Sequence, residues 1–426
     1  RRLKGMRLLV LGAGRNQVNA IKRAKQKGHT VIVSDYLPDA PGKKLADYSE
    51  MTSTFDIEGN IAVARKYNVD GVFTVGTDQP VLTAAYVAEA LALPQMISTA
   101  TALKATHKKH MKAAFWAHNI PTSPYLLIKQ TELEYTSRLL CKLNQLKFPV
   151  VVKPVDSQGQ RGVFKIPRLD ENIISFMRQT FAHTRDEEII VEEYCAGDEI
   201  TISGWVDDHK PYILIITDRP LLNVEPRIGI MTAHHFPSPY TFSHHDELQN
   251  LVNNTIKALD IASGPVYLQV IMTPEGAKLV EIACRIGGGH EEELIPLVTG
   301  IDLVDMVIDK SLGKSINMTQ LENYRLLDNP HYAQTKFIMA HPGQVKTWGS
   351  LEAIKRMPGV VNARFYDPQL KEIKEIVDSA TSRWGYIIVT ASSQQELEKY
   401  VFNAYNMVEI LDYEDNNLLR IVDTKA

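Results

Sequence analysis

Short apolar runs alternate with helix-length segments over the first hundred residues. Residues 8–11, 31–34 and 72–75 are apolar runs of strand length, and the segments between them are long enough for helices. Continuous apolar runs are typical of parallel strands that are buried on both faces. The pattern therefore predicts a βαβ unit at the start of the chain.

The middle of the chain is richer in strands, which favours an α+β arrangement over a second parallel sheet. Residues 99–125 have the spacing of one amphipathic helix that ends near Asn119 and Pro121. We predict a helix over 245–261, and paired strands on either side of the Thr-Pro-Glu-Gly turn. The further predicted elements are strands at 150–152, 163–166, 189–193, 199–206, 266–272 and 277–283, and a helix at 170–181.

A polar stretch at about 314–332 separates a last unit from the rest of the chain. Residues 334–340 and 385–391 have the apolar character of strands. The segment that follows them, to about residue 408, predicts a helix with Ser392 or Ser393 as its N-cap.

The first apolar run leads into a glycine turn that is typical of nucleotide-binding proteins. Gly12 and Gly14 follow that run, and Asp35 ends the second one, where a dinucleotide site keeps the acid that binds ribose. Position 17 is Gln, however, where that fingerprint requires a small residue so that helix and strand pack closely. The turn therefore fits a nicotinamide-dependent dehydrogenase poorly.

The composition is that of an ordinary globular protein and excludes two classes of partner. Of the 426 residues, 44% are hydrophobic and 23% are charged, enough for roughly two to four compact units. The net charge of −3 argues against a protein that coats nucleic acid, and no apolar run approaches the ~20 residues of a membrane span. Cys141, Cys195 and Cys284 lack metal-ligand spacing, so we expect a reduced, cytoplasmic protein.

Five local features follow one another in an order that indicates chemistry. Lys108 precedes "NIPTSPY", Lys153 ends the apolar strand "FPVVVKP", and "DSQGQRGV" follows as a polar loop with two glycines. "IIVEEYCAGDE" then places paired acids on a strand, with Glu199 after a turn. Finally, "LQVIM" and "KLVEIACRIGGG" bring onto adjacent strands Gln269, Glu281 and Arg285.

Together these residue types suit the binding of ATP. Lysines from separate elements neutralise a triphosphate, and a loop with glycines lays backbone N–H groups over its phosphates. The backbone edge of a strand offers adenine a donor and an acceptor, and a carboxylate beyond it takes the ribose hydroxyls. Magnesium prefers hard oxygen ligands, which Gln269 and Glu281 supply. Arg285 is predicted to face the same way as Glu281 and to steady the transferred phosphoryl group.

This ordered set resembles the ATP-grasp superfamily, and "VEIACRIGGGH" with "TGIDLVDMVI" is most similar to its L-amino-acid ligases and other carboxylate–amine ligases. The resemblance implies α/β and α+β architecture. It places a pre-ATP-grasp, Rossmann-like βαβ domain at 1–98, an ATP-grasp fold of two α+β subdomains at 99–318, and a C-terminal lid domain at 319–426. The smaller subdomain, at about 122–190, is expected to be mobile. In this family the first domain keeps a Gly-x-Gly loop and a strand-end Asp but binds no dinucleotide.

The resemblance also implies roles for individual residues. The implied catalytic residues are Arg285, Glu281 and Lys153, and the implied ligands of Mg²⁺, or of Mn²⁺ in its place, are Gln269 and Glu281. The implied ATP-binding residues are Lys108, Lys153, Ser157, Gly159, Gln160, Gly162, Val163, Glu192, Glu193, Tyr194, Cys195 and Glu199. The candidates on the substrate side are His234, His235, Gly287, Gly288, Gly289 and His290.

Two positions depart from the pattern of the family. An Asn usually stands two residues after the metal-binding Glu, and Ala283 stands there in this chain. The number of metal ions, one or two, therefore remains open. The first metal position is Gln269 in place of an acid, which also occurs in the carbamoyl phosphate synthetase branch.

Some candidates also have plain structural explanations. Lys108 and Lys109 are adjacent and either suits a solvated helix face, but the spacing to "NIP" favours Lys108. Cys284 is expected to be a small buried thiol and not a nucleophile, because acyl-phosphate chemistry needs none. His234 and His235 are explained equally well by a surface loop.

The expected reaction joins a carboxylate to an amine through an acyl phosphate, with ADP and phosphate released. We expect small-molecule carboxylate and amine substrates, in particular amino acids, and an amide or dipeptide product. Two alternatives remain open: another acceptor, as in biotin carboxylases, carbamoyl phosphate synthetases or purine-pathway ligases, and a non-catalytic ATP-binding sensor, which Ala283 favours. No nucleic-acid or membrane partner is expected, and a homodimer is common in the family.

Overall fold

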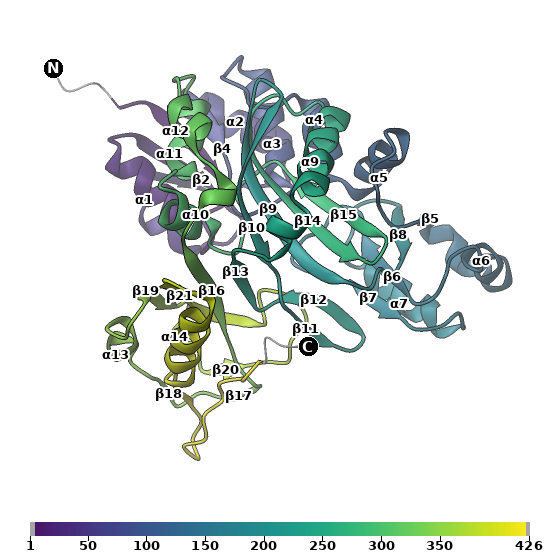
Figure 1. Ribbon diagram of the computed structural model, residues 1–426. Helices are drawn as coiled ribbons and strands as arrows, with labels where there is room; N and C mark the ends of the chain where they lie inside the picture. Colours follow the sequence, from purple (N-terminus) through teal and green to yellow (C-terminus); the bar gives the residue numbers. More distant parts are fainter. Residues whose placement is uncertain (1–4, 423–426) are drawn as a thin grey trace.

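The computed structural model describes residues 5–422, and its N-terminal part is the predicted βαβ unit (Figure 1). The sheet is parallel, with strand order β3-β2-β1-β4. Its central strands are fully buried, as continuous apolar runs predict. The elements are β1 (Arg7–Leu11), α1 (Val18–Gln26), β2 (Thr30–Ser34), the 3-10 turn η1 (Pro41–Lys44), β3 (Tyr48–Glu50), α2 (Ile57–Tyr67), β4 (Gly71–Phe73) and α3 (Pro80–Ala90).

The glycine turn of this unit is occupied by the protein's own groups. Gln17 is buried, its Oε1 accepts a hydrogen bond from the Gly14 N–H at 2.9 Å, and its Nε2 donates to the Val75 carbonyl at 2.6 Å. The Asp35 carboxylate accepts the Ala13 N–H at 2.9 Å. The groups that would hold a pyrophosphate and a ribose are therefore used inside the turn, which is the physical reason to reject a dinucleotide site here.

The single helix predicted over 99–125 is wrong, because two helices form there. These are α4 (Thr99–Thr106) and α5 (Lys108–Ala117), and His107 between them has extended backbone. The Lys108 N–H donates to the Val155 carbonyl at 2.8 Å instead of continuing the helix. Tertiary hydrogen bonding thus overrides the local helical pattern and begins α5 at Lys108.

A smaller α+β part follows, with its own core, on the right of Figure 1. Its four-stranded sheet has the order β5-β8-β6-β7, and every strand pair in it is antiparallel. The core lies between residues 128 and 191, which covers much of the stretch predicted to form the smaller subdomain. The elements are β5 (Tyr125–Lys129), η2 (Gln130–Glu134), α6 (Thr136–Leu143), β6 (Val150–Pro154), β7 (Phe164–Ile166), α7 (Asn172–Phe181) and β8 (Glu188–Glu193).

An eight-stranded sheet in the order β15-β14-β9-β10-β13-β16-β21-β19 forms the centre of the molecule. The paired strands predicted around the Thr-Pro-Glu-Gly turn are confirmed as the hairpin β14–β15, in which Gln269 lies opposite Glu281. A second hairpin, β11–β12, was not predicted. The elements of this part are β9 (Asp198–Asp207), β10 (Lys210–Asp218), β11 (Leu221–Val224), β12 (Arg227–Met231), β13 (Ala233–Phe236), α8 (Tyr240–Ser243), α9 (His245–Leu259), β14 (Gly264–Thr273), β15 (Gly276–Ala283), α10 (Glu291–Thr299), α11 (Leu303–Ser311), α12 (Met318–Asn323) and η3 (Leu326–Asp328).

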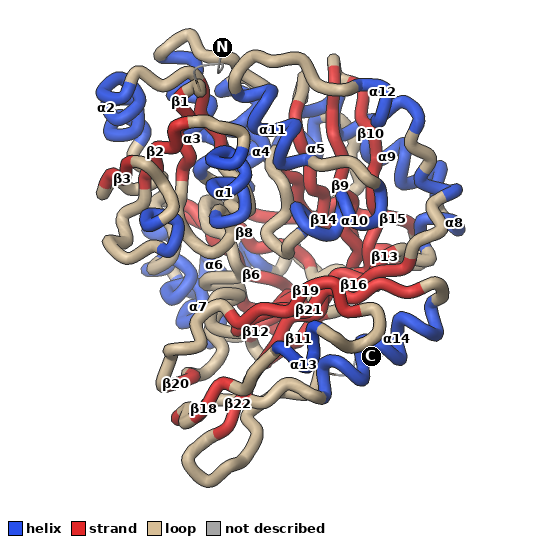
Figure 2. The backbone as a smooth tube through the Cα atoms, turned by 90° about the vertical axis from the view of Figure 1, so that its left-hand side faces the viewer, coloured by secondary structure: helices blue, strands red, loops and turns tan. Residues whose placement is uncertain are grey.

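The C-terminal part continues this sheet, because β13 pairs with β16 (Figure 2). It nevertheless has a separate core between residues 338 and 419. Its elements are β16 (Tyr332–Met339), β17 (Gly343–Gln344), β18 (Thr347–Trp348), α13 (Glu352–Lys355), β19 (Val360–Phe365), β20 (Glu372–Ile373), β21 (Arg383–Ala391), α14 (Gln394–Asn406) and β22 (Ile410–Leu411). Within residues 5–422, no helix has both the length and the apolar character that crossing a bilayer requires.

The predicted cap of the last helix is confirmed, and it is Ser393. The Ser393 side chain accepts a hydrogen bond from the Glu396 N–H at 3.1 Å. We predict that Ser393→Ala lowers the free energy of unfolding of the C-terminal part by about 1 kcal/mol, because an orphan N–H loses its acceptor. Hydrogen exchange in the first turn of α14 measures this, with Ser392→Ala as the matched control. Equal effects of the two substitutions would contradict the cap.

Candidate active site

A cavity lies between the small sheet and the β14–β15 edge of the large sheet. Both sheets contribute to its wall, and so does α5. Most of the residues predicted to bind ATP line it, whereas Gly162 does not. The predicted residues in the lining are Lys108, Lys153, Ser157, Gly159, Gln160, Val163, Glu192, Glu193, Tyr194, Cys195, Glu199, Gln269 and Glu281.

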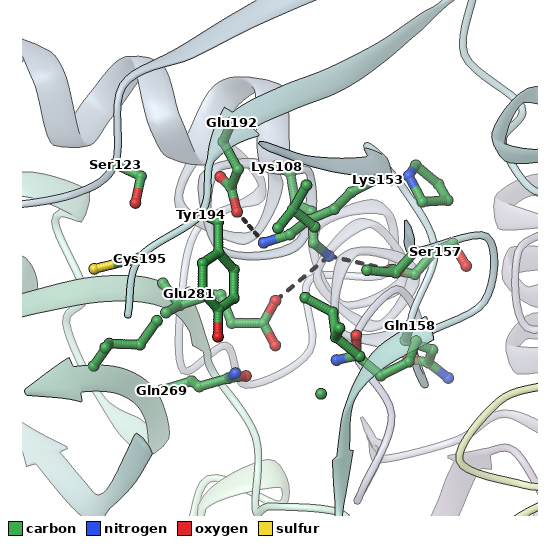
Figure 3. Close-up of a pocket in the computed structure, with 18 of the residues that line it drawn as sticks. Lys108, Ser123, Lys153, Ser157, Gln158, Glu192, Tyr194, Cys195, Gln269 and Glu281 are labelled. Carbon is green, nitrogen blue, oxygen red and sulfur yellow. Dashed lines mark hydrogen bonds and ion pairs between the residues drawn. The ribbon is translucent and has the colours of Figure 1, made fainter. Parts of the chain in front are cut away.

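The Glu192 carboxylate lies between two buried lysines. Its Oε2 is 3.0 Å from Lys112 Nζ, and its Oε1 forms an ion pair with Lys153 (Figure 3). Burial alone would raise the pKa of Glu192, but the charges of Lys112 and Lys153 lower it to about 2. Burial lowers the pKa of Lys112. Burial also acts to lower the pKa of Lys153, but the neighbouring Glu192 carboxylate outweighs it and raises the pKa of Lys153 overall. The carboxylate is therefore ionised at neutral pH.

Sequence reasoning missed Lys112 and assigned only the backbone of Glu192 to the site. Lys112 stands four residues after Lys108 in α5, so both side chains leave the helix on one face. That spacing is the signal that could have found Lys112. Lys109, the alternative to Lys108, forms an ion pair with Glu188 and is not part of the cavity lining.

Lys108 connects the loop at residues 156–163 with the strand β15. Its Nζ donates to the Ser157 carbonyl at 3.1 Å and lies 3.5 Å from Glu281 Oε2 (Figure 3). Burial alone would raise the pKa of Glu281, but the charges of Lys108, Lys153 and nearby arginines lower it. Glu281 lines the cavity, and Lys108 is its ion-pair partner there. Such a carboxylate fits a hard cation.

Glu199 is held by two partners, one of which sequence reasoning missed. Its Oε2 accepts from Arg219 Nη1 at 2.7 Å and from Gln269 Nε2 at 2.9 Å. The Gln269 amide thus turns its nitrogen to Glu199, and its carbonyl oxygen remains as the possible metal ligand. Arg219 follows the end of β10. No sequence motif marks it, because Arg219 and Glu199 are brought together only by the pairing of β10 with β9.

Comparisons with known proteins agree with this geometry. Residues 146–292 match the ATP-grasp domain family. A protein of Sinorhizobium fredii is 21% identical over 63% of this chain, which spans 54% of that protein's length. The phosphoribosylamine–glycine ligase of Methanococcus maripaludis is 25% identical over 75% of this chain and 76% of its own. The structure of an L-amino acid ligase from Bacillus licheniformis has a TM-score of 0.79 at 19% identity, over 96% of this chain and 99% of its own.

Residues 146–292 are thus identified as an ATP-grasp domain. The expected mixed α/β and α+β architecture is confirmed by this likeness.

Arg285 lies just after β15 and pairs with the N-terminal part. Its Nε and Nη2 both contact Asp78 Oδ1, at 2.7 and 2.6 Å. Arg285 does not line the cavity itself, whereas Asp78 does, and sequence reasoning missed Asp78. The Asp78 N–H in turn donates to Gln158 Oε1. The arginine therefore connects the end of β15 to the loop at 156–163 through Asp78.

The loop at 156–163 is held by the C-terminal part. Gly159, Gln160 and Gly162 have φ angles of 70°, 63° and 67°, a conformation that favours glycine. The Gly159 carbonyl accepts the Ser379 N–H at 2.9 Å, and Arg161 Nε lies 3.3 Å from Asp378. The ATP-grasp loop thus covers the cavity in a conformation that two other parts of the chain support.

The predicted substrate-side residues lie outside the cavity lining. His234 is buried against Glu291, 2.8 Å from its carboxylate, whereas His235 contacts Gln394 of α14 at 2.7 Å. Neighbouring residues of a strand point to opposite faces, so these two histidines do not share one site. Gly287, Gly288 and Gly289 form the turn after Arg285 that leads to His290, whose Nε2 is 2.6 Å from the Tyr366 hydroxyl.

Cys284 lies in a separate, mostly apolar cavity beside Pro265 and Val307. Burial raises the pKa of its thiol to about 12. All three cysteines are free thiols. A protonated thiol away from the ATP-grasp cavity supports the packing role expected for Cys284.

We predict that Glu192→Gln lowers the free energy of unfolding at pH 7 by about 3 kcal/mol, because Lys112 and Lys153 lose their shared counter-charge. The pKa of Glu192 is below its unfolded value, so this stabilisation is present above pH 4.5 and is lost as the pH falls towards 2. Denaturant unfolding at several pH values measures the difference from the unmodified protein. Glu193→Gln is the matched control, since its carboxylate accepts only the Lys147 N–H. A difference that does not shrink at low pH would contradict the ion-pair account.

Proposed function

We propose that this protein is an ATP-dependent carboxylate–amine ligase that forms an amide bond, in particular between amino acids, and releases ADP and phosphate. The observation that carries the proposal is the Glu281 carboxylate, which pairs with the Lys108 ammonium in a cavity lined by two more lysines. The names of the relatives agree with this reaction class, because an L-amino acid ligase and a phosphoribosylamine–glycine ligase both join an amine to a carboxylate.

ATP is the proposed ligand of the cavity. Lys108, Lys153 and the backbone of the 156–163 loop would hold its phosphates. The Tyr194 N–H already donates to the Pro149 carbonyl, whereas the Cys195 N–H has no acceptor among the described residues. Cys195 therefore offers the backbone donor that adenine requires. Glu199 would take the ribose hydroxyls, with Arg219 holding its carboxylate in place.

Glu281 and the Gln269 carbonyl oxygen would hold magnesium, or manganese in its place. When bound, the ion would offset the negative charge of the phosphates and orient them. Ala283 supplies no oxygen ligand at the position where the family usually has Asn. The side chains present thus fit one ion better than two.

The reaction proceeds in two balanced steps. A carboxylate oxygen attacks the γ-phosphorus of ATP, the bond to the β,γ-bridging oxygen breaks, and ADP leaves with that electron pair. The nitrogen of an amine then attacks the acyl carbon, phosphate leaves with one oxygen of the original carboxylate, and the nitrogen loses a proton. The Arg285–Asp78 pair and the 156–163 loop would close the cavity so that water does not hydrolyse the acyl phosphate.

An amino-acid panel tests the function. We predict that ATP with Mg²⁺ raises the melting temperature, while NAD and NADP do not, and that some amino-acid pairs cause phosphate release. Release with bicarbonate alone would indicate a carboxylase. A shift with ATP but no release under any of these conditions would indicate an ATP-binding sensor. A shift with NAD and none with ATP would overturn the nucleotide assignment.

A second prediction separates the metal site from the nearby thiol. Glu281→Gln keeps the size of the side chain but removes the charge that holds the cation, so ADP formation should fall by about a hundredfold, ~2.7 kcal/mol of transition-state stabilisation. Cys284→Ser changes only packing and should keep most of the rate. Both variants must retain a cooperative thermal transition. A dead Cys284 variant beside a fully active Glu281 variant would rule out this mechanism.

A further inference from the structure

A second cavity lies between the N-terminal sheet and the large sheet, and we call it the apolar cavity. It shares no lining residue with the candidate ATP cavity. One of its walls comes from β4 and α3, and the other comes from the start of β14, from Cys284 after β15 and from α11. The segment at 94–97, which connects α3 to α4, lines it as well. The apolar cavity thus lies where the N-terminal part meets the large sheet.

Alanine, valine and other apolar side chains make up most of the lining of the apolar cavity, and among residues 5–422 no charged side chain lines it. Two of its polar side chains are committed to the backbone. Thr74 Oγ1 donates to the Leu11 carbonyl at 2.8 Å. Gln95 Nε2 donates to the Ala85 carbonyl at 3.2 Å. A charged molecule would leave its charge without a partner in this cavity, which is costly, so the lining selects uncharged molecules.

Ser263 is the remaining polar side chain of the lining, and its hydroxyl is unpaired. The residue is 9% exposed, and its buried Oγ has no hydrogen-bond partner in the part of the chain that the structure describes. Buried hydroxyls in folded proteins are nearly always hydrogen-bonded, because an unpaired one is destabilising. Cys284 adds only a weakly polar thiol to the lining. A ligand with one hydrogen-bond donor or acceptor would therefore satisfy the Ser263 hydroxyl.

The two walls of the apolar cavity continue directly into the ion pair of Arg285 with Asp78. Cys284 of one wall precedes Arg285, and Thr74 of the other wall stands shortly before Asp78. Arg285 Nη2 lies 2.6 Å from Asp78 Oδ1, and the Asp78 N–H in turn holds the loop at 156–163. A molecule in the apolar cavity would therefore contact both of the segments that meet in this ion pair.

We propose that the apolar cavity binds a small uncharged molecule with an apolar body and one hydrogen-bonding group, and that the bound molecule braces the ion pair of Arg285 with Asp78. The apolar body would pack against the aliphatic lining, and the polar group would pair with the Ser263 hydroxyl. This site is additional to the candidate ATP cavity and does not depend on the proposed ligase reaction. Amino acids and nucleotides are charged and are expected not to bind in it.

Methyl NMR of the full chain without nucleotide tests the site. Met96 lines the apolar cavity, and Met407, an exposed residue of the C-terminal part, is the internal control. The two signals are assigned with Met96→Leu and Met407→Leu in protein labelled with ¹³C at the methionine methyl groups. We expect benzyl alcohol to shift the Met96 signal saturably, because an aromatic ring beside the methyl group changes its shielding, and to leave Met407 unchanged. Benzylamine, which is similar in size but positively charged at neutral pH, should shift neither signal.

Two variants and one control locate the bound molecule. Ala84→Phe fills the apolar cavity from α3 and should abolish the Met96 response, whereas Ala90→Phe, at an exposed position of the same helix, is the matched control. Ser263→Ala removes the unpaired hydroxyl and should weaken the binding of benzyl alcohol by about fivefold, while the binding of toluene stays unchanged. If Ala84→Phe loses its cooperative thermal transition, Ser263→Ala decides the result, since it deletes a single oxygen.

Hydrogen exchange tests the bracing of the ion pair. The Gly76 N–H donates to the Ile286 carbonyl at 3.1 Å and so joins the same two segments as Arg285 and Asp78. Its exchange should slow when benzyl alcohol is bound. Unchanged or faster exchange would rule out the bracing.

The binding site itself is overturned by any of three results. The first is a Met96 signal that responds to benzyl alcohol no more than the Met407 signal does. The second is a full Met96 response in a folded Ala84→Phe variant. The third is an equal effect of Ser263→Ala on the binding of benzyl alcohol and of toluene.

Discussion

The buried carboxylate of Glu192 is the interaction on which the rest of the site depends. It lies between Lys112 of α5 and Lys153 of β6, so it ties a helix to the small sheet at the wall of the cavity. One negative charge facing two positive charges leaves positive charge in excess, and that excess favours the entry of an anion. The contact that joins these two parts of the molecule therefore also leaves a local positive charge that would suit the proposed triphosphate.

Around this pair, the chain brings two distant segments to one loop. Asp78 of the N-terminal part contacts Gln158, and Ser379 of the C-terminal part contacts Gly159. Each of these hydrogen bonds is worth about 1 kcal/mol, and Arg161 of the additional Arg161–Asp378 ion pair is exposed, so we expect that the loop can be released without loss of the surrounding cores. A cover of this kind suits a reaction in which an acyl phosphate must be kept from water but products must leave.

Local patterns predicted much of the fold, and long-range contacts explain the rest. The parallel strands, the β14–β15 hairpin and the Ser393 cap follow from apolar periodicity and turn chemistry, which are local in sequence. The break at His107 was missed because Val155, far along the chain, accepts the Lys108 N–H. Tertiary hydrogen bonds of this kind leave no trace in the periodicity of the helix itself.

The same distinction applies to the site. Lysines and acids at strand ends were predicted, since a charged residue after a buried strand needs a reason to be there. Arg219 and Asp78 were missed, because Glu199 contacts Arg219 from a neighbouring strand and Arg285 contacts Asp78 from a distant part of the chain. Lys112 is the exception, since its spacing from Lys108 on one helix face was visible in the sequence.

Transfer of oxygen from the carboxylate substrate to phosphate tests the central claim most directly. A carboxylate substrate labelled with ¹⁸O is incubated with the protein, ATP, Mg²⁺ and an amine, and the released phosphate is analysed by mass spectrometry. An acyl-phosphate mechanism predicts one ¹⁸O atom in each phosphate and the other in the amide. Released phosphate without ¹⁸O, with its fourth oxygen supplied by water, would contradict the account of this cavity as a site of carboxylate activation.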